Sequence, residues 1–187
     1  MSLLDLRVLG DPILRRETTP VAALTDDVRR LIDDMFETMH AAKGIGLAAP
    51  QVGRIERVAV VDVEGGKQPF ALVNPEVVSV GGTTEKSEEG CLSIPDIFGD
   101  VERPTTAVVR ALDRDGKPFE IQGVELLARC LLHEIDHLHG KLFIDYLSVL
   151  KRRSALAKWG KTKDRYPGFI RKLTEEELAE HHSNEEL

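Results

Sequence analysis

Cysteine and long apolar runs are both scarce in this sequence. Only two of its 187 residues are cysteine, Cys91 and Cys130, which excludes a small disulfide-dense secreted fold. The longest apolar runs, such as Val58 to Val61, stop far short of the roughly 20 residues that span a bilayer. The first residues also lack the succession of basic, apolar and small residues that marks a secretory signal. We therefore expect a cytoplasmic protein without a membrane span, in which each thiol is a ligand, a nucleophile or a core residue.

Basic residues are outnumbered by acidic ones. The chain carries 25 Lys and Arg against 32 Asp and Glu, a net charge of −7, which disfavours nucleic-acid binding through the whole surface. Neither an internal repeat nor a linker rich in Pro, Gly and Ser divides the chain. With 42% hydrophobic residues, the length suits one domain with a buried core. We place this domain at residues 1–150 and treat residues 151–187 as a C-terminal extension.

The distribution of apolar residues predicts an α+β fold. Apolar residues recur at three-and-four spacing up to residue 42, which predicts a helix capped by Thr25. A second helix is predicted over residues 124–139, with Gly140 as its terminator. Between the helices lie short β-branched segments separated by tight turns, which favour antiparallel strands: residues 57–63, 70–73, 76–80, 105–112 and 117–121.

The second predicted helix contains the string LLARCLLHEIDHLHG at residues 126–140. It places His133 and His137 one turn apart, so both imidazoles can bind one cation from the same helix face. At about 100° per residue, Glu134 falls between that face and the apolar stripe. A carboxylate beside apolar groups has a raised pKa, which suits a group that takes up and returns a proton near neutral pH. The pattern therefore predicts a metal site with an adjacent general base.

A catalytic metal centre typically has three protein ligands and one open position, so two histidines leave it incomplete. Both cysteines are candidates for the third ligand. Cys130 could bind from the same helix, but it lies in an apolar run and we favour it as part of a cavity wall. Cys91, within the string EEGCLSIP at residues 88–95, can approach from a second element. We favour Cys91 as the ligand.

The string GIGLAAPQ at residues 44–51 matches the dinucleotide-binding pattern G-x-G-x-x-G/A. That pattern needs a strand before it and a helix after it. Here a helix precedes the string, and Pro50 disfavours helical angles at the residue before it. We therefore expect no nucleotide cofactor. We interpret the string as a glycine-thinned segment whose backbone can accept a peptide strand, with the Gln51 amide available as a hydrogen-bond donor.

Three strings together resemble the motifs of peptide deformylase: GIGLAAPQ at residues 44–51, EGCLS at residues 89–93 and HEIDH at residues 133–137. This bacterial-type metalloenzyme family removes the formyl group from the N-terminal methionine of nascent chains. The resemblance covers residues 3–150. It implies an α+β fold in which antiparallel β-sheets pack around a central helix carrying the histidine pair, followed by a C-terminal helical tail. It also implies a hydrolase that releases formate from N-formylmethionyl peptides.

The resemblance also implies a role for individual residues. Glu134 would be the acid and base, and the Gln51 side chain and Leu92 backbone N–H would donate hydrogen bonds to the oxyanion. One divalent metal ion would be bound, in this family often Fe²⁺, with Zn²⁺, Ni²⁺ or Co²⁺ as alternatives. Its three ligands would be Cys91, His133 and His137. Five further residues would bind the substrate: Gly44, Ile45, Gly46, Leu126 and Cys130.

Two other functions stay open on the residues alone. A zincin-like metallopeptidase shares the His-Glu-x-x-His string but takes a third His or Glu from further downstream, and the histidines after His137 are poorly spaced for that role. The second alternative is a non-catalytic, ribosome-associated module with a structural metal site. In that case protein groups would fill every coordination position.

The C-terminal extension divides by charge. Residues 151–172 carry nine basic residues and one acidic residue, a composition typical either of a solvated helix face or of a contact for a polyanion. In the family resembled, the C-terminal helix can dock on the ribosome, which makes a ribosome contact of this segment a hypothesis. Residues 174–187 carry six Glu and no Lys or Arg, which predicts a frayed, solvated tail.

Overall fold

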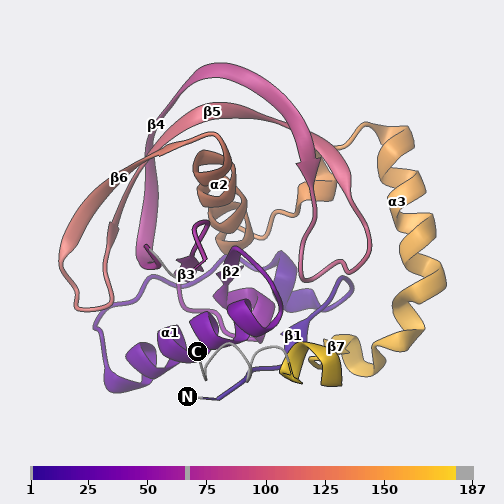
Figure 1. The fold of residues 1–187 in the computed structure, drawn as a ribbon, viewed down its shortest axis with the longest axis horizontal. Coiled ribbons are helices and arrows are strands. Elements are labelled where there is room, and N and C mark those ends of the chain that lie inside the picture. The colour runs from indigo at the N-terminus through magenta and orange to yellow at the C-terminus, as the bar shows by residue number, and fades with distance from the viewer. Residues whose placement is uncertain (1, 66–67, 180–187) are drawn as a thin grey trace.

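The computed structural model describes residues 2–65 and 68–179, which form the predicted α+β fold (Figure 1). Its main sheet is antiparallel throughout, with the strand order β2-β3-β4-β5-β6. Helix α2 (Leu126–Leu138) lies inside the arch made by the two longest strands (Figure 1). The five strands are β2 (Gly46–Ala48), β3 (Val58–Val61), β4 (Phe70–Glu89), β5 (Gly99–Leu112) and β6 (Pro118–Val124).

Strand β3 is apolar at every position because both faces of the sheet are covered there. Val58 and Val60 pack in a core cluster with Leu31, Met35 and Met39 of helix α1 (Asp26–Ala41). Ala59 and Val61, on the opposite face, pack in a second cluster with Leu131 and Ile135 of α2. A strand buried on both faces loses the alternation of apolar and polar residues. The continuous run Val58–Val61 is the sequence signature of this arrangement.

The two predicted helices form close to their expected limits. Thr25 caps α1 by accepting a hydrogen bond from the Val28 N–H at 3.3 Å, and Asp26 and Asp27 occupy its first turn. The helix ends where the Gly44 N–H bonds to the Met39 carbonyl. Helix α2 ends before Gly140, whose φ of 68° is a left-handed conformation. These boundaries confirm the expected pattern of caps.

Residues 70–73 and 76–80 form β-structure as predicted, but the prediction that they are two separate short strands is wrong. These residues belong to one strand, β4, which continues to Glu89. Its register against β5 shifts at three places, after Val73, Val77 and Gly81. Bulges of this kind bend a strand and increase its twist, and β4 arches over α2 as a result. Residues 76–88 are exposed, so this stretch lacks the period-2 burial pattern that would have indicated a continuous strand.

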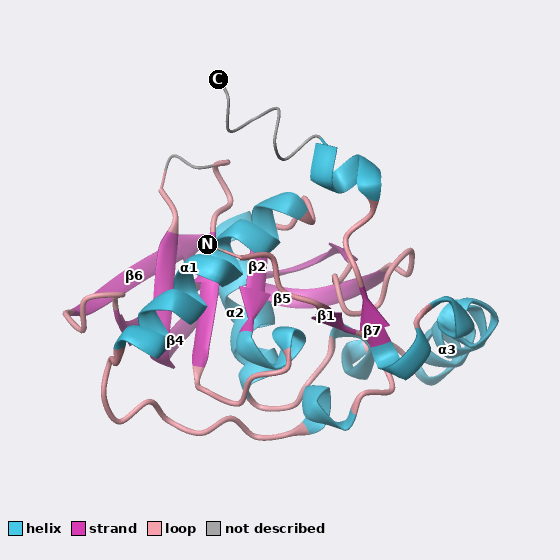
Figure 2. Ribbon diagram, turned by 90° about the horizontal axis from the view of Figure 1, so that it is seen from below, coloured by secondary structure: helices cyan, strands magenta, loops and turns pink. Residues whose placement is uncertain are grey.

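The C-terminal extension packs back onto the N-terminal residues. Helix α3 (Val149–Thr162) buries Trp159, whose indole N–H bonds to the Leu9 carbonyl at 3.1 Å. Strand β7 (Ile170–Arg171) pairs with β1 (Leu6–Arg7) in a two-stranded antiparallel sheet beside α3 (Figure 2). Residues 175–179 are helical. The prediction of a frayed tail is therefore wrong for these residues, and residues 180–187 lie outside the described part.

No helix among the described residues has the length and apolar character needed to cross a membrane. Short 3-10 turns connect the main elements. These turns are η1 (Pro12–Arg15), η2 (Ala49–Val52), η3 (Phe143–Tyr146), η4 (Lys163–Arg165) and η5 (Pro167–Phe169).

Candidate active site

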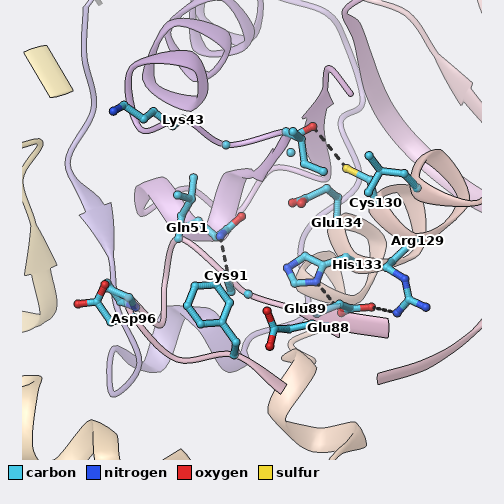
Figure 3. Close-up of a pocket in the computed structure, with 18 of the residues that line it drawn as sticks. Lys43, Gln51, Glu88, Glu89, Cys91, Asp96, Arg129, Cys130, His133 and Glu134 are labelled. Atoms are coloured by element: carbon cyan, nitrogen blue, oxygen red, sulfur yellow. Dashed lines mark hydrogen bonds and ion pairs between the residues drawn. The ribbon is translucent and has the colours of Figure 1, made fainter. Parts of the chain in front are cut away.

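A cavity of about 480 Å³ brings together nearly all of the residues predicted for the site (Figure 3). It lies between the segment leading into β2, the loop after β4 and one face of α2. His137 is buried one turn further along α2, next to the cavity wall. The predicted residues that line the cavity are Gly44, Ile45, Gly46, Gln51, Cys91, Leu92, Leu126, Cys130, His133 and Glu134.

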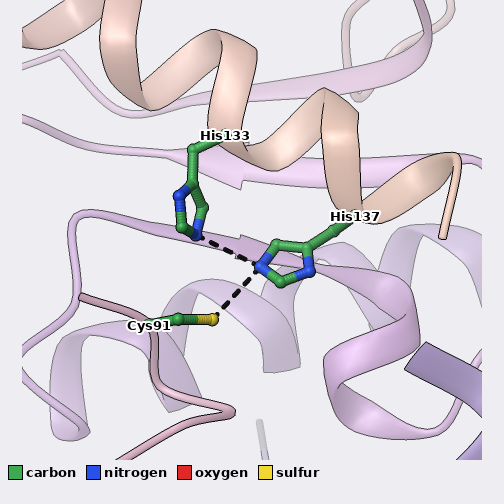
Figure 4. A group of neighbouring side chains, drawn as sticks. All are labelled: Cys91, His133 and His137. Atoms are coloured by element: carbon green, nitrogen blue, oxygen red, sulfur yellow. Dashed lines mark hydrogen bonds between the residues drawn. The ribbon is translucent and has the colours of Figure 1, made fainter. Parts of the chain in front are cut away.

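Three of these side chains converge through atoms that can ligate a metal (Figure 4). The Nε2 atom of His137 lies 3.2 Å from the Sγ atom of Cys91 and 3.2 Å from the Nε2 atom of His133. All three ligand atoms lie within 4.8 Å of one another. One sulfur and two imidazole nitrogens are a donor set that suits zinc and other first-row transition metals. The residues present therefore fit a divalent ion with three protein ligands.

The structure brings Cys91, rather than Cys130, to the two imidazoles. The Cys130 thiol instead approaches the carbonyl of Ile45 at 3.4 Å. Burial raises the pKa of Cys130 well above its usual value, which keeps it a neutral thiol. Burial likewise lowers the pKa of His137 well below its usual value, and the imidazole is then neutral, as a metal ligand must be.

Gln51 presents its amide N–H₂ group to the ligand cluster. Its Oε1 atom accepts a hydrogen bond from the Ala48 N–H at 2.8 Å, which fixes the orientation of the amide. The Nε2 atom then lies 3.4 Å from Cys91 Sγ and 3.2 Å from the Ser93 hydroxyl. The side chain is 1% exposed. A buried donor is thus held beside the ligand sulfur.

Glu89 orients the first imidazole, a role that the sequence analysis missed. Its Oε2 atom lies 3.0 Å from His133 Nδ1, so a proton on Nδ1 leaves the Nε2 lone pair facing the ligand cluster. Burial opposes ionisation of Glu89, but the hydrogen bonds from His133 and Arg103 prevail and lower its pKa. Arg103 holds both carboxylate oxygens, at 2.6 and 3.0 Å, and Arg129 adds a contact at 2.7 Å. The His133 imidazole is therefore held in place by the Glu89 carboxylate, which is itself fixed by two arginines.

Arg103 is itself held in place from the far side. Its Nη1 atom donates to Asp136 at 2.8 Å, and Asp136 also accepts from the Tyr146 hydroxyl at 2.9 Å. The guanidinium lies 4.7 Å from the centre of the Tyr146 ring. Glu89 could have been suspected because it lies within the EGCLS string, whereas nothing in the local sequence around Arg103 indicated this contact.

Glu134 is buried between the cavity and the apolar core. It is 4% exposed, and its Oε2 atom has no hydrogen-bond partner among the described residues. Burial raises the pKa of Glu134 to about 7, because desolvation disfavours the carboxylate. A Cβ atom at Gly46 would lie 2.3 Å from Glu134 Oε1. Only glycine at this position allows β2 to approach the carboxylate so closely.

Strand β2 presents a free backbone edge to the cavity. It is the terminal strand of the main sheet and pairs only with β3 among the described residues. The Ile45 carbonyl accepts a hydrogen bond from the Asp62 N–H at 2.9 Å. Because bonding groups alternate along an antiparallel strand, the N–H and C=O of Gly46 point away from β3. An extended peptide can therefore bind along this edge.

The mouth of the cavity combines an apolar rim with charged side chains. Ile45, Phe98 and Leu126 form an exposed apolar rim, with 41%, 61% and 52% of their surface accessible. The remaining charged residues at the cavity come from loops, from β4, from α2 and from β7, and the sequence analysis assigned none of them a role in the site. They are Lys43, Glu88, Asp96, Arg129 and Arg171.

Comparison with known proteins yields one family. The model of the family described as polypeptide deformylase matches residues 3–153. The peptide deformylase of Alkalilimnicola ehrlichii is 54% identical over 155 residues, covering 82% of this chain and 86% of the relative. That of Hydrogenovibrio crunogenus is 52% identical over 162 residues, covering 86% and 95% of the two chains.

Solved structures of the same kind superpose closely. The crystal structure of a peptide deformylase from Legionella pneumophila has a TM-score of 0.84 and 48% identity, covering 87% of this chain and 96% of that one. The structure of a peptide deformylase from Synechococcus elongatus in complex with actinonin has a TM-score of 0.81 and 43% identity. It covers 84% of this chain and 88% of that chain.

Proposed function

This chain belongs to the polypeptide deformylase family, and we propose that its cavity performs the family's reaction with a divalent metal ion held by Cys91, His133 and His137. The reaction is the metal-dependent hydrolysis of the formyl group from the N-terminal formylmethionine of newly synthesised polypeptides, with release of formate. The observation that carries the proposal is the convergence of three ligand atoms within 4.8 Å beside a cavity that contains Glu134. When bound, the ion supplies a Lewis acid that polarises a carbonyl and lowers the pKa of water.

Glu134 serves as the general base and then as the general acid. Its carboxylate accepts a proton from water as the water oxygen attacks the formyl carbon. The same carboxyl group then returns the proton to the amine nitrogen as the C–N bond breaks, and formate and a free N-terminal methionine result. The burial that raises the pKa of Glu134 to about 7 favours both directions of transfer near neutral pH. The positive charge of a bound ion opposes this shift.

Gln51 and Leu92 stabilise the negative charge that develops on the formyl oxygen. The Gln51 amide N–H₂ group is already oriented towards the ligand cluster, 3.4 Å from Cys91 Sγ. Leu92 directly follows Cys91 and lines the same cavity, so its backbone N–H is the second donor. Loss of one such preorganised donor typically costs roughly 2.7–4 kcal/mol of transition-state stabilisation.

The substrate peptide binds as an added strand on the free edge of β2. The Gly46 N–H and C=O provide the backbone contacts, and Gly44 and Ile45 continue this surface. Leu126 and Cys130, which line the cavity from α2, contact the methionine side chain. In this arrangement the formyl group reaches Glu134 because Gly46 lies directly against that carboxylate.

We propose Fe²⁺ as the native ion, with Zn²⁺, Ni²⁺ and Co²⁺ as functional substitutes. A thiolate and two imidazoles can bind all four of these ions. The donor set by itself therefore does not identify the native ion. Purification without oxygen followed by elemental analysis identifies the ion, and formate release from a formylmethionyl peptide measures the activity. Iron at about one equivalent with active protein would support the proposal, whereas activity that survives complete removal of metal would contradict it.

The alternative functions find less support in the site. A zincin-like metallopeptidase needs a downstream His or Glu ligand, but His139 is bonded to Glu17 at 2.7 Å instead. His181 and His182 lie outside the described residues. A closed structural site needs a fourth protein ligand, and the described residues supply three. Cleavage of an internal peptide bond, tested beside formate release, separates the first alternative from deformylation.

We further propose that α3 contacts the ribosome and that the protein works in the cytoplasm, where nascent chains emerge. The helix buries Ala155 and Trp159 against the domain and exposes a basic face made by Lys151, Arg152, Arg153, Lys158 and Lys161. Such a face binds RNA phosphates through a salt-dependent attraction. Co-sedimentation with ribosomes at low and high salt, repeated after charge reversal at Arg153 and Lys158, tests this contact.

A further inference from the structure

The C-terminal extension contributes one residue to the lining of the substrate cavity. The family match ends at residue 153, yet Arg171 of β7 lines the cavity together with Lys43 and Asp96. Figure 3 shows Lys43 and Asp96 on the side of the cavity opposite Cys130 and Glu134, with the C-terminal ribbon beyond them. A residue beyond the part matched by the family model thus reaches the cavity.

This segment is anchored to the domain at several points. Ile170 and Arg171 pair with Arg7 and Leu6. The carbonyl of Phe169 accepts a hydrogen bond from the Val8 N–H at 3.0 Å. Leu173 packs against the core cluster that contains residues of α1 and β3. The position of Arg171 at the cavity is therefore set by the fold.

The guanidinium of Arg171 is held in one orientation by Glu177. Its Nη2 atom donates to Glu177 Oε1 at 2.5 Å, and both side chains are about 15% exposed. Glu177 is itself fixed by a capping box with Thr174. The Thr174 N–H donates to Glu177 Oε2 at 2.7 Å, and the Glu177 N–H donates to the Thr174 hydroxyl at 3.1 Å. A planar group with five donors, held on one side, is preorganised to bind a further anion.

The direction of the bound peptide leads towards this group. The formyl end lies beside Gly46 and Glu134, as proposed above. Beyond Gly46 in one direction, Leu47 and Ala48 are fully buried, and the Ala48 N–H is bonded to Gln51. The peptide must therefore leave in the other direction, past Ile45 and Gly44 towards Lys43. Residues downstream of formylmethionine then pass the end of the cavity that Arg171 lines.

We propose that Arg171 is a specificity-determining residue that binds an acidic side chain of the substrate downstream of formylmethionine. This inference rests on the deformylase function proposed above. Arg171 is largely shielded from solvent, so its charge acts more strongly than that of an exposed group. The acidic residues Glu88 and Asp96 at the same cavity are exposed, and solvent weakens their repulsion of a substrate carboxylate.

The test measures formate release by the metal-loaded protein from amidated formylmethionyl peptides. Each peptide carries Glu or Gln at the second, third or fourth residue in an otherwise alanine chain. For at least one of these positions, we expect the parent protein to have a higher kcat/KM for the Glu peptide than for the Gln peptide. Arg171→Gln should lower the Glu-to-Gln ratio of kcat/KM by about threefold to fivefold. Lys172→Gln, which removes the same charge from an exposed neighbour, should leave the ratio unchanged.

Glu177→Gln separates recognition from a purely structural role. Glutamine keeps the capping box but removes the competing negative charge, so this variant should raise the Glu-to-Gln ratio. Equal losses on all peptides in both variants would overturn the proposal, as would a ratio independent of Arg171 at every position. Calorimetry can measure binding of the deformylated product peptides without turnover. The Glu peptide should bind the parent protein more tightly than the Gln peptide, and Arg171→Gln should reduce this difference. If no formylated peptide is cleaved, the proposed function fails, and calorimetry still decides the role of Arg171.

Discussion

Replacing Gly46 by alanine tests how closely β2 must approach the catalytic carboxylate. The added Cβ atom would lie 2.3 Å from Glu134 Oε1, whereas an ordinary contact begins at 3.4 Å. The carboxylate must therefore move by about 1 Å, and a displacement of that size costs on the order of 100-fold in rate. Gly46 does not have a positive φ, so alanine is compatible with its backbone. We expect kcat/KM for formate release to fall about 100-fold, with metal content unchanged.

Two further variants make this prediction specific. Gly160→Ala in α3, where nothing lies within 4 Å of the new Cβ, should leave activity unchanged and stabilise the helix by roughly 0.5–1 kcal/mol. In a Glu134→Ala background there is no carboxylate to displace, and of the nearest atoms only the Cys130 thiol, 2.9 Å from the new Cβ, must still shift. Gly46→Ala should then cost much less than 100-fold of the residual activity. A full loss in that background, or normal activity of the single variant, would refute the proposed link between Gly46 and Glu134.

Three other predictions concern the metal centre. Glu134→Ala should lose about 10²- to 10⁴-fold in kcat while retaining metal; elemental analysis and formate release check this, and full activity would reject Glu134 as the base. Cys91→Ser should weaken metal retention more than Cys130→Ser, and the reverse order in elemental analysis would reassign the ligand. Glu89→Gln should weaken metal affinity about 10- to 100-fold by disturbing His133; unchanged competition with a chelator would argue against this role.

Much of the fold could be predicted because its signals are local. The helix at Asp26–Ala41 follows from its cap and from the period of its buried face. The antiparallel arrangement follows from tight turns between apolar segments. Strand β4 could not be delimited because its exposed half, residues 76–88, has neither alternation nor a covered face. The β1–β7 pair was equally hidden, since two residues per strand carry no periodic signal.

The site residues that could be predicted are likewise those marked by a local sequence pattern. His133, Glu134 and His137 share one helix, so helix geometry alone relates them. Gln51 and Cys91 were expected beside them because each lies in a distinctive string, and the structure brings all of these residues to one centre. Arg171 could not be predicted. Its approach to the cavity depends on the whole path of the C-terminal extension.

The sequence analysis missed the first six residues of β5 and also the charged residues that support His133, and both errors have one physical cause. Residues 99–104 include Asp100, Glu102 and Arg103, and charged residues at this density indicate a loop or a solvated edge, because charged side chains are rarely buried without partners. The structure buries Arg103 here because Glu89 and Asp136 provide the partners. A strand prediction based on apolar residues at buried positions fails where a functional site requires a buried charged residue. The error in the strand boundary therefore marks the position of the charge network that holds His133.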